Sequence, residues 1–444
     1  MRVLIAVHGT RGDIEPCAAV GRELLARGHS VRVAVPPNLV SFVESVGFPS
    51  VVPWGPDSTA RVLSWDPRAM SKWEVERDGT DNRTDGYGAT GRAGYLAGLN
   101  PLTIWQLFRA YLVDGWAEMG RTLTDLGSDA DVILTGMTYQ EVAFNVAEFY
   151  GVPLVAMHWC PVRSNDYTLP VQLPRPLRDG VFALTEWVFW RALKPAEDKQ
   201  RISLELPTAT TRSARRIVER GTVEIQAYDK VLFPGLDDKW PQRPFVGFLG
   251  LNAETSNDAE VTAWIDAGSA PVYFGFGSTP IDHPEQVLDM IRTVCGELGV
   301  RGLVNSSGWN LVDVPYDNNV RVVDRANYRL VFPKCRAVVH HGGAGTVAEG
   351  VRAGVPTVAV WSTADQPLWA RRIERLGIGA SLKLSKMTRD SLSSSLRKVL
   401  SPGTGDRVRD VAAEMVTAGK GVEMAATLVE DAVTSVAGIK TRGN

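Results

Sequence analysis

The stretch from Ala337 to Val360 reads AVVHHGGAGTVAEGVRAGVPTVAV and contains one complete strand-helix-strand unit. An apolar strand, Ala337 to Val339, leads into a Gly-rich turn, a helix follows over residues 346–353, and Pro356 to Val360 forms the next strand. A helix of this length is the usual crossover between two parallel strands. The stretch therefore predicts a parallel α/β architecture.

The same pattern occurs in three other parts of the chain. Near the N-terminus, the apolar run from Val3 to Val7 is followed by helical spacing over residues 14–25 and by a second strand at residues 31–35. The pattern returns at residues 132–157 and again from residue 271. Strands that alternate with helices predict parallel sheets covered on both faces, and we expect an α/β fold with two Rossmann-like lobes.

The length of 444 residues and one Pro-rich stretch predict where the lobes divide. Residues 233–244 are rich in Pro and turn residues, which is typical of a linker. We expect an N-terminal lobe at residues 1–235, a linker at 236–252 and a C-terminal lobe at 253–418. The active site is expected in the cleft between the two lobes.

The composition excludes several classes of function. Hydrophobic residues make up 44%, charged residues 22%, and the formal charge of -2 offers no electrostatic attraction to nucleic acid. No apolar run approaches the ~18 residues of a membrane-spanning helix, and the first one is too short for a signal peptide. The cysteines lie far apart with no CxxC pair, which favours neither a metal site nor disulfides and indicates the cytoplasm. They are Cys17, Cys160, Cys295 and Cys335.

The strongest chemical signal is the turn that begins His340-His341-Gly342-Gly343 and ends at Thr346, between a strand and a helix. Glycines allow a ligand to approach the backbone closely, and the free N–H groups of a helix N-terminus bind a diphosphate without a metal. A dinucleotide site and a plain tight turn are the alternatives. The G-x-G-x-x-G spacing of dinucleotide sites is absent after every predicted strand, which favours the diphosphate.

From His341 onward, the chain resembles the donor motif of the family-one glycosyltransferases of the GT-B fold. The match continues without a gap through Gly343, Thr346, Glu349, Gly354-Val355-Pro356 and Asp365-Gln366. Three phrases, GTRGDIEP, HHGGAGTVAEGVRAGVP and WSTADQPLWA, are most similar to actinobacterial enzymes that glycosylate antibiotics, sterols or glycopeptidolipids.

The resemblance implies a role for each matched residue. His341 would contact the donor diphosphate, Glu349 the ribose, and Asp365 with Gln366 the hydroxyls of the sugar. A family tryptophan that stacks on the base is replaced here by Val323, so the resemblance does not identify the base. The other expected donor contacts are Thr10, Arg11, Gly12, Ser278, Thr279, Arg325, Asn327, Gly342, Gly343, Gly345 and Thr346.

Ser278 belongs to a turn that ends the predicted strand at residues 271–276 and resembles the family's Gly-Ser phosphate turn. Because sites in open parallel sheets gather at the carboxyl ends of strands, Ser278 is expected to donate to the diphosphate. An ordinary strand-ending turn is the alternative.

The segment HGTRGDIEP, residues 8–16, follows the first strand, and its Asp13 occupies the place of the catalytic residue in the bacterial enzymes. Asp13 is therefore expected to act as general base, provided that partial burial raises its pKa. Helix capping is a second role for Asp13, and His8 is an alternative base. We expect acceptor contacts from His8, Trp73, His158 and Trp159. Trp73 lies in a Trp-rich insertion at residues 53–116, for which a poorly ordered loop is an equal alternative.

These expectations combine into one function. The N-terminal lobe would bind a lipid or natural-product acceptor, and the C-terminal lobe would bind a dTDP- or UDP-sugar as co-substrate. Transfer of a hexose or 6-deoxyhexose to an acceptor hydroxyl would invert the anomeric carbon and need neither a cofactor nor a metal. The tail at residues 419–444 is expected to cross back to the first lobe, and a lipid acceptor would bring the protein into peripheral contact with a membrane. The alternatives are a sugar-nucleotide epimerase and a silent accessory protein that binds a nucleotide sugar or a partner transferase.

Overall fold

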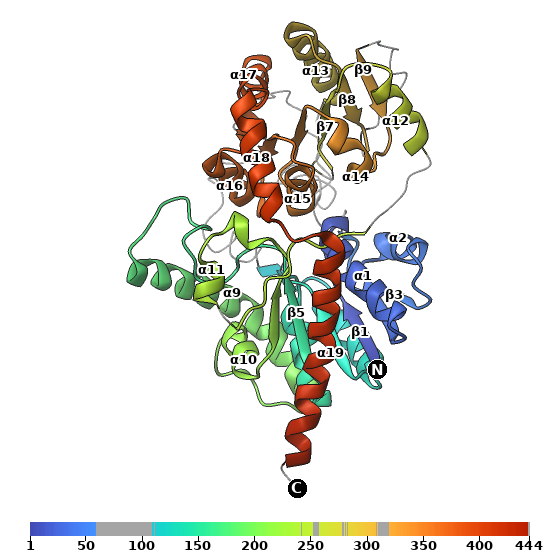
Figure 1. Cartoon of the computed structure of the whole chain (residues 1–444). Helices are drawn as coiled ribbons and strands as arrows, with labels where there is room; N and C mark the ends of the chain where they lie inside the picture. The colour runs from blue at the N-terminus through green and yellow to red at the C-terminus, as the bar shows by residue number, and fades with distance from the viewer. Residues whose placement is uncertain are drawn as a thin grey trace, which may run out of the picture. The chain divides into compact units, whose positions relative to one another are not determined.

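The computed structural model describes residues 1–58, 109–110, 112–240, 242–251, 257–277, 279, 281, 283–307, 309 and 319–442. The chain forms two compact units. The first unit contains Met1–His158, Leu173–Ile225 and Val422–Asn444, and the second contains Trp159–Gln172 and Gln226–Gly421. Each is built on a six-stranded sheet with helices packed against it (Figure 1).

The strands of the first sheet lie in the order β3-β2-β1-β4-β5-β6. Their bounds are β1 Arg2–Ala6, β2 Ser30–Val35, β3 Val51–Pro53, β4 Val132–Thr135, β5 Leu154–His158 and β6 Val223–Gln226. The α-helices described in this part of the chain are α1 Arg11–Ala26, α2 Val40–Ser45, α7 Trp116–Gly127, α8 Gln140–Tyr150, α9 Arg175–Ser203 and α10 Ser213–Glu219.

The strands of the second sheet lie in the order β12-β11-β10-β7-β8-β9. They are β7 Val272–Gly275, β8 Gly302–Asn305, β9 Val320–Val323, β10 Ala337–His340, β11 Thr357–Trp361 and β12 Gly379–Lys383. The helices that follow the first sheet are α11 Leu236–Lys239, α12 Asp258–Asp266, α13 Pro284–Leu298, α14 Tyr328–Val331, α15 Ala344–Arg352, α16 Gln366–Leu376, α17 Arg389–Val399, α18 Pro402–Glu414 and α19 Ala418–Arg442.

The two sheets have the same topology. In each, the first strand of the unit pairs in parallel with its second and its fourth, so the strand order reverses between β1 and β4 and between β7 and β10. Ligands of open α/β sheets bind outside the carboxyl ends of the strands at such a reversal. The turns after β1, β7 and β10, which carry Asp13, Thr279 and His341 among the predicted site residues, all lie at these two points. The expected two-lobe α/β fold is confirmed.

Alternating side chains of the second sheet fill two cores on its opposite faces. Val272 and Phe274 of β7 pack in one core with Leu288 and Ile291 of α13, whereas Tyr273 between them packs in the other with residues of α12 and α14. Burial on both faces explains why these strands are continuous apolar runs in the sequence.

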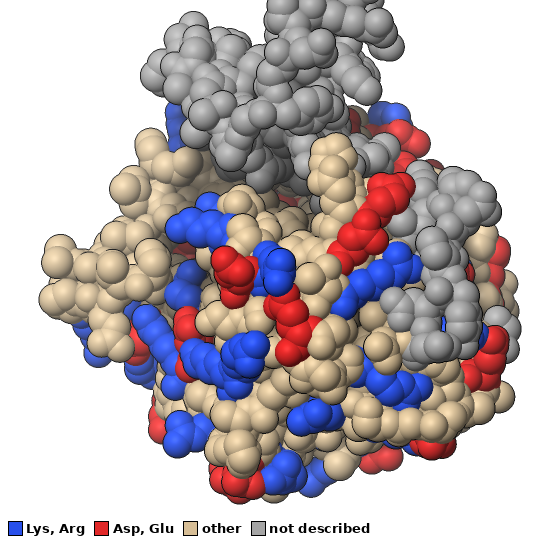
Figure 2. Space-filling view, turned by 90° about the horizontal axis from the view of Figure 1, so that it is seen from above, with Lys and Arg blue, Asp and Glu red and all other residues tan. Residues whose placement is uncertain are grey.

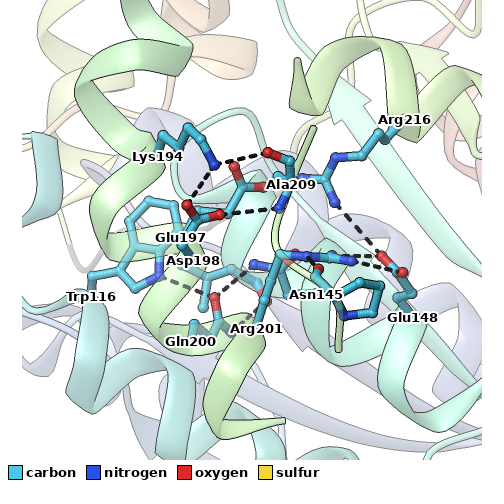
Figure 3. A network of polar contacts seen from close by, with 12 residues as sticks. Trp116, Asn145, Glu148, Lys194, Glu197, Asp198, Gln200, Arg201, Ala209 and Arg216 are labelled. Atoms are coloured by element: carbon cyan, nitrogen blue, oxygen red, sulfur yellow. Dashed lines mark hydrogen bonds and ion pairs between the residues drawn. The ribbon is translucent and has the colours of Figure 1, made fainter. Parts of the chain in front are cut away.

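A buried polar network fixes the C-terminal half of α9 in the first unit (Figure 3). Arg201 donates to both carboxylate oxygens of Glu148 on α8, at 2.8 and 3.0 Å. The side-chain oxygen of Gln200 accepts from Trp116 at 3.0 Å and from Asn145 at 2.9 Å. Because a buried charge left without its partner is costly, these contacts hold α9 against α7 and α8.

The helical C-terminal part of the chain is interrupted between α18 and α19. α18 ends at Glu414, and Met415 has extended backbone angles (φ -72°, ψ 145°). The carboxylate of Asp229 accepts from the backbone N–H of Val416 at 2.6 Å and from that of Phe248 at 3.1 Å. Burial raises the pKa of Asp229, and the two N–H donors oppose that shift. Asp229 therefore stabilises the interruption from a position far away in the sequence.

From Val422 onward, α19 belongs to the first unit (Figure 1). Arg27, which follows α1, donates to the Glu430 carboxylate at 2.7 Å and to the backbone oxygen of Glu423 at 3.0 Å. His29 contacts the other oxygen of Glu430 at 2.7 Å. In the sequence, the second unit is therefore flanked on both sides by segments of the first.

The surface carries both signs of charge. Lys and Arg side chains are interspersed with Asp and Glu on the face shown in Figure 2, as the formal charge of -2 suggests. Within the described parts of the chain, none of the helices is both long and apolar enough to cross a membrane.

Candidate active site

The turn between β10 and α15 begins with two histidines, His340 and His341, whose surroundings differ. His340, the last residue of β10, is fully buried, and its Nδ1 accepts the backbone N–H of Gly342 at 3.0 Å. Burial and the neighbouring His341 lower the pKa of His340 to about 3, so the ring is neutral at physiological pH. His340 therefore fixes the backbone of the turn, and none of the described residues forms a hydrogen bond with its Nε2.

His341 lies between two glycines at the end of the sheet. A methyl group on Gly343 would come within 2.4 Å of its Nε2, and one on Gly277 within 2.8 Å of its Cε1. Both positions are therefore restricted to glycine by close approach. Burial lowers the pKa of His341 to about 4, and its Nδ1 has no hydrogen-bond partner in the described part of the chain. The neutral ring can donate one hydrogen bond to a ligand.

The N-terminus of α15 lacks the groups that usually satisfy a helix. Gly343 is its N-cap, no side chain caps it, and its first turn contains no acidic residue. The first N–H groups of a helix have no partner within the helix and carry the positive end of its dipole. Gly345 is exposed and Thr346 is buried in this first turn. The arrangement is suited to an anion.

The β7 turn meets the β10 turn through the contact of Gly277 with His341. In the β7 turn, the backbone N–H of Thr279 donates to the backbone oxygen of Phe276 at 3.0 Å. Ser278, predicted to donate to the diphosphate, lies outside the described residues.

The turn between β11 and α16 contains Asp365 and Gln366. Asp365 is the N-cap of α16, and its Oδ2 accepts from the indole of Trp369 at 2.8 Å. Burial raises the pKa of Asp365, although this hydrogen bond acts in the opposite direction. The Oε1 of Gln366 accepts from the backbone N–H of Ser362 at 2.8 Å, which leaves its amide NH₂ without a partner in the described chain.

A strained residue precedes this pair. Ala364 has a φ of 58°, a value that costs energy for a residue with a side chain. Such strain is held by surrounding structure and is concentrated at functional turns. Sequence reasoning did not find it.

Glu349 on α15 has two arginine partners that the sequence analysis missed. Its Oε1 accepts from Arg352 at 2.9 Å, and its Oε2 lies 3.7 Å from Arg329 of α14. The i,i+3 spacing of Glu349 and Arg352 was the available signal. Asn327 caps α14 through its Oδ1 and donates to Asp258 at 3.2 Å, whereas the neighbouring Arg325 is exposed.

The turn between β1 and α1 is organised around Asp13. Its Oδ2 accepts from the backbone N–H of Thr10 at 2.6 Å and from the Thr10 hydroxyl at 3.1 Å. Thr10 is the N-cap and Asp13 the third residue of the helix, so the pair forms a capping box. A methyl group on Gly9 would come within 2.2 Å of the carboxylate, which requires glycine there. The capping role of Asp13 is thus present.

The remaining predicted residues of this turn face outward. Arg11 is exposed, forms an i,i+4 pair with Glu15 at 3.4 Å and lies over the Phe42 ring. Gly12 is exposed as well.

His8 is packed among aromatic rings. It is buried at the end of β1, contacts the Pro56 oxygen through Nε2 at 2.9 Å and lies edge-on to Trp54 and Tyr139. Tyr139, with a φ of 58°, is a second strained position and begins the helix after β4. These contacts are those of a core histidine that orders the turn.

The other predicted acceptor contacts lie near the end of β5. His158 is buried and its Nε2 contacts the Gln140 side-chain oxygen at 2.9 Å. Trp159 is buried and begins the first segment of the second unit. Trp73 lies outside the described residues.

The structure brings the predicted residues together in two groups, one on each unit. The β10, β7 and β11 turns with α15 form the group on the second unit, which carries most of the residues predicted to bind the donor, and the β1 turn forms the group on the first. Within the described residues, no cluster of three or more His, Cys, Asp or Glu side chains is arranged to hold a metal ion. The fold is that of an α/β protein whose ligand sites lie at the carboxyl ends of parallel strands.

The chain is similar to known proteins over nearly its whole length. Residues 285–430 match the erythromycin biosynthesis protein CIII-like C-terminal domain, and residues 3–56 match the glycosyltransferase family 28 N-terminal domain. An uncharacterised glycosyltransferase of Mycobacterium tuberculosis is 42% identical over 435 residues, covering 97% of this chain and 99% of the relative. A sterol 3-beta-glucosyltransferase of Arabidopsis thaliana is 31% identical over 428 residues, covering 93% of this chain and 65% of the plant protein. The chain belongs to the family-one glycosyltransferases of the GT-B fold.

Solved structures show the same fold. The glycosyltransferase of kitacinnamycin superposes with a TM-score of 0.67 at 18% identity, covering 97% of this chain and 99% of that one. The glycosyltransferase VinC in complex with dTDP gives a TM-score of 0.62 at 17% identity, covering 97% and 99%.

Proposed function

We propose that this glycosyltransferase transfers a hexose or 6-deoxyhexose from a dTDP- or UDP-sugar to a hydroxyl of a lipid or natural product, such as a glycopeptidolipid, a sterol or a macrolide. The observation that carries the proposal is the uncapped N-terminus of α15 beside the neutral His341, whose Nδ1 has no partner among the described residues. Together they offer donors and a positive dipole to a leaving diphosphate.

The reaction would be a single displacement. The acceptor oxygen attacks the anomeric carbon, its proton passes to Asp13, and the bond from that carbon to the diphosphate oxygen breaks with its electron pair. His341 and the α15 N–H groups stabilise the charge that develops on the diphosphate, so no metal is required. Attack opposite the leaving group inverts the anomeric configuration.

Two lines support the choice of substrates. The dTDP complex of VinC supports a nucleotide-sugar donor, and the plant sterol glucosyltransferase supports a largely apolar acceptor. We also propose that the protein works in the cytoplasm, because all four cysteines are unpaired and buried.

The test is nucleotide release from a panel of dTDP- and UDP-sugars, with and without EDTA and with sterol, glycolipid or macrolide acceptors. The proposal expects one donor to give acceptor-dependent turnover that EDTA leaves unchanged, and the proton coupling constant of the product to show inversion. Loss of turnover in EDTA contradicts metal independence, and retained configuration contradicts the single displacement. Binding of donor without any turnover favours the accessory role.

A further inference from the structure

The parallel strands of the second sheet arrange the donor subsites in a line. The carboxyl ends of β11, β10, β7, β8 and β9 lie at one edge of the sheet in that order. If the sugar contacts Asp365 after β11 and the diphosphate contacts His341 after β10, the nucleoside must extend in the other direction. It then lies over the ends of β7 and β8, and this step rests on the proposed function.

The end of β8 carries an aromatic side chain that the donor motif does not include. Ser306 continues the pairing with β9, and the backbone N–H of Trp309 donates to the Ser306 oxygen at 2.7 Å. The Trp309 ring stacks on Phe276, which directly follows β7, with 5.8 Å between centroids and 24° between planes. Trp309 is thus held at the carboxyl ends of β7 and β8.

The indole N–H of Trp309 is buried and has no hydrogen-bond partner among the residues that the structure describes. Such orphaned donors are rare in native proteins, because each one forfeits the hydrogen bond it made to water. Other polar side chains nearby are already satisfied: the Tyr273 hydroxyl accepts from Asn305 at 3.1 Å, and Asn327 uses both its oxygen and its nitrogen.

We propose that Trp309 recognises the nucleoside of the donor by donating its indole N–H to an oxygen of the ribose or pyrimidine. Adjacent strands are ~4.8 Å apart, so the β8 end lies about 10 Å from the β10 end, a distance that a ribose and a base can cover. The contact supplies a base-side anchor in a chain that has Val323 where the family's stacking tryptophan stands.

The experiment compares the affinities of UDP, dTDP and inorganic pyrophosphate for the wild type, Trp309→Phe and Trp361→Phe by calorimetry. Trp309→Phe keeps an aromatic ring against Phe276 and removes only the N–H. Trp361 is the matched control, because it lies at the end of β11 and its indole donates to Ser381 at 3.0 Å. Thermal melting shows that each variant is folded.

We expect Trp309→Phe to weaken UDP and dTDP roughly fivefold to tenfold and to leave pyrophosphate unchanged. Trp361→Phe should bind all three ligands as the wild type does. Unchanged UDP and dTDP affinity in a folded Trp309→Phe overturns the inference while the donor site stands, and so does an equal loss for pyrophosphate. If the wild type binds none of the three, the proposed function itself fails and the inference fails with it.

Discussion

The turns after β1 and β10 each lead into a helix, and the two helices differ in how their N-terminal N–H groups are satisfied. Each follows the strand at which its sheet reverses, and each begins with a buried histidine and leads into a helix. In the first unit, Asp13 in the first turn of α1 accepts from the N-cap residue and places a negative charge at the positive end of the helix. In the second, α15 has neither cap nor acid, so its positive end remains available. The comparison teaches that a helix terminus left unsatisfied by its own sequence is the better pointer to an anion site.

The largest effect is expected from separating the two roles of Asp13. Asp13→Asn keeps an oxygen that can accept from Thr10 but removes the base, so turnover should fall about 10²- to 10⁴-fold with little change in melting temperature. Steady-state nucleotide release and thermal melting measure the two effects. Turnover within a few-fold of the wild type would mean that Asp13 only caps α1.

The next largest effect is expected from removing the hydrogen-bond donor of His341 in the turn after β10. His341→Gln removes the ring held between Gly277 and Gly343, and we expect kcat to fall roughly 100-fold, as for the loss of one donor to a developing anion. Single-turnover kinetics with saturating donor isolate this step. A change confined to KM would assign His341 to ground-state binding alone.

The contrast between the two helices can be tested by placing an acidic residue in the first turn of α15, as α1 has. Gly345 is exposed and a side chain there meets nothing within 4 Å, so Gly345→Asp should fold and even stabilise the helix by about 0.3–1 kcal/mol. Its charge should nevertheless weaken diphosphate binding about tenfold. Gly345→Asn is the neutral control, and equal affinities of the two variants for UDP contradict an anion site at this terminus.

The smallest effect concerns pH. The folded pKa of His341 is about 4 and its usual value is 6.5, so the unfolded chain takes up a proton first as the pH falls. The stability that depends on neutral His341 is therefore complete above about pH 6.5 and is lost between about 6.5 and 4. Over this range the melting temperature of His341→Gln should fall ~1–3 °C less than that of the wild type. Parallel curves for the two proteins would show that the ring is not desolvated.

Much of the fold could be predicted because it depends on local patterns. The strand predicted at Ala337 to Val339 is β10, Ala337–His340, and the helix expected over residues 346–353 is α15, Ala344–Arg352. The interruption at Met415 could not be predicted, because the stabilising carboxylate, Asp229, comes from another part of the chain.

The candidate site also combines residues that local sequence patterns reveal with contacts that they do not. Residue type and motif spacing located His341, Asp13 and Asp365 at the carboxyl ends of strands, where the structure has them. The positive φ of Ala364, the arginine partners of Glu349 and the stacking of Trp309 on Phe276 depend on tertiary contacts. No spacing along the chain reveals such contacts.

The return of α19 to the first unit has a consequence for biosynthesis. The ribosome makes α1 and its sheet first, yet Glu430, the partner of Arg27 and His29, is made only after the whole of the second unit. During translation the first unit is therefore exposed along the surface that α19 will cover. A stop codon just before Val422 would leave the β7, β10 and β11 turns in place and still damage the first unit.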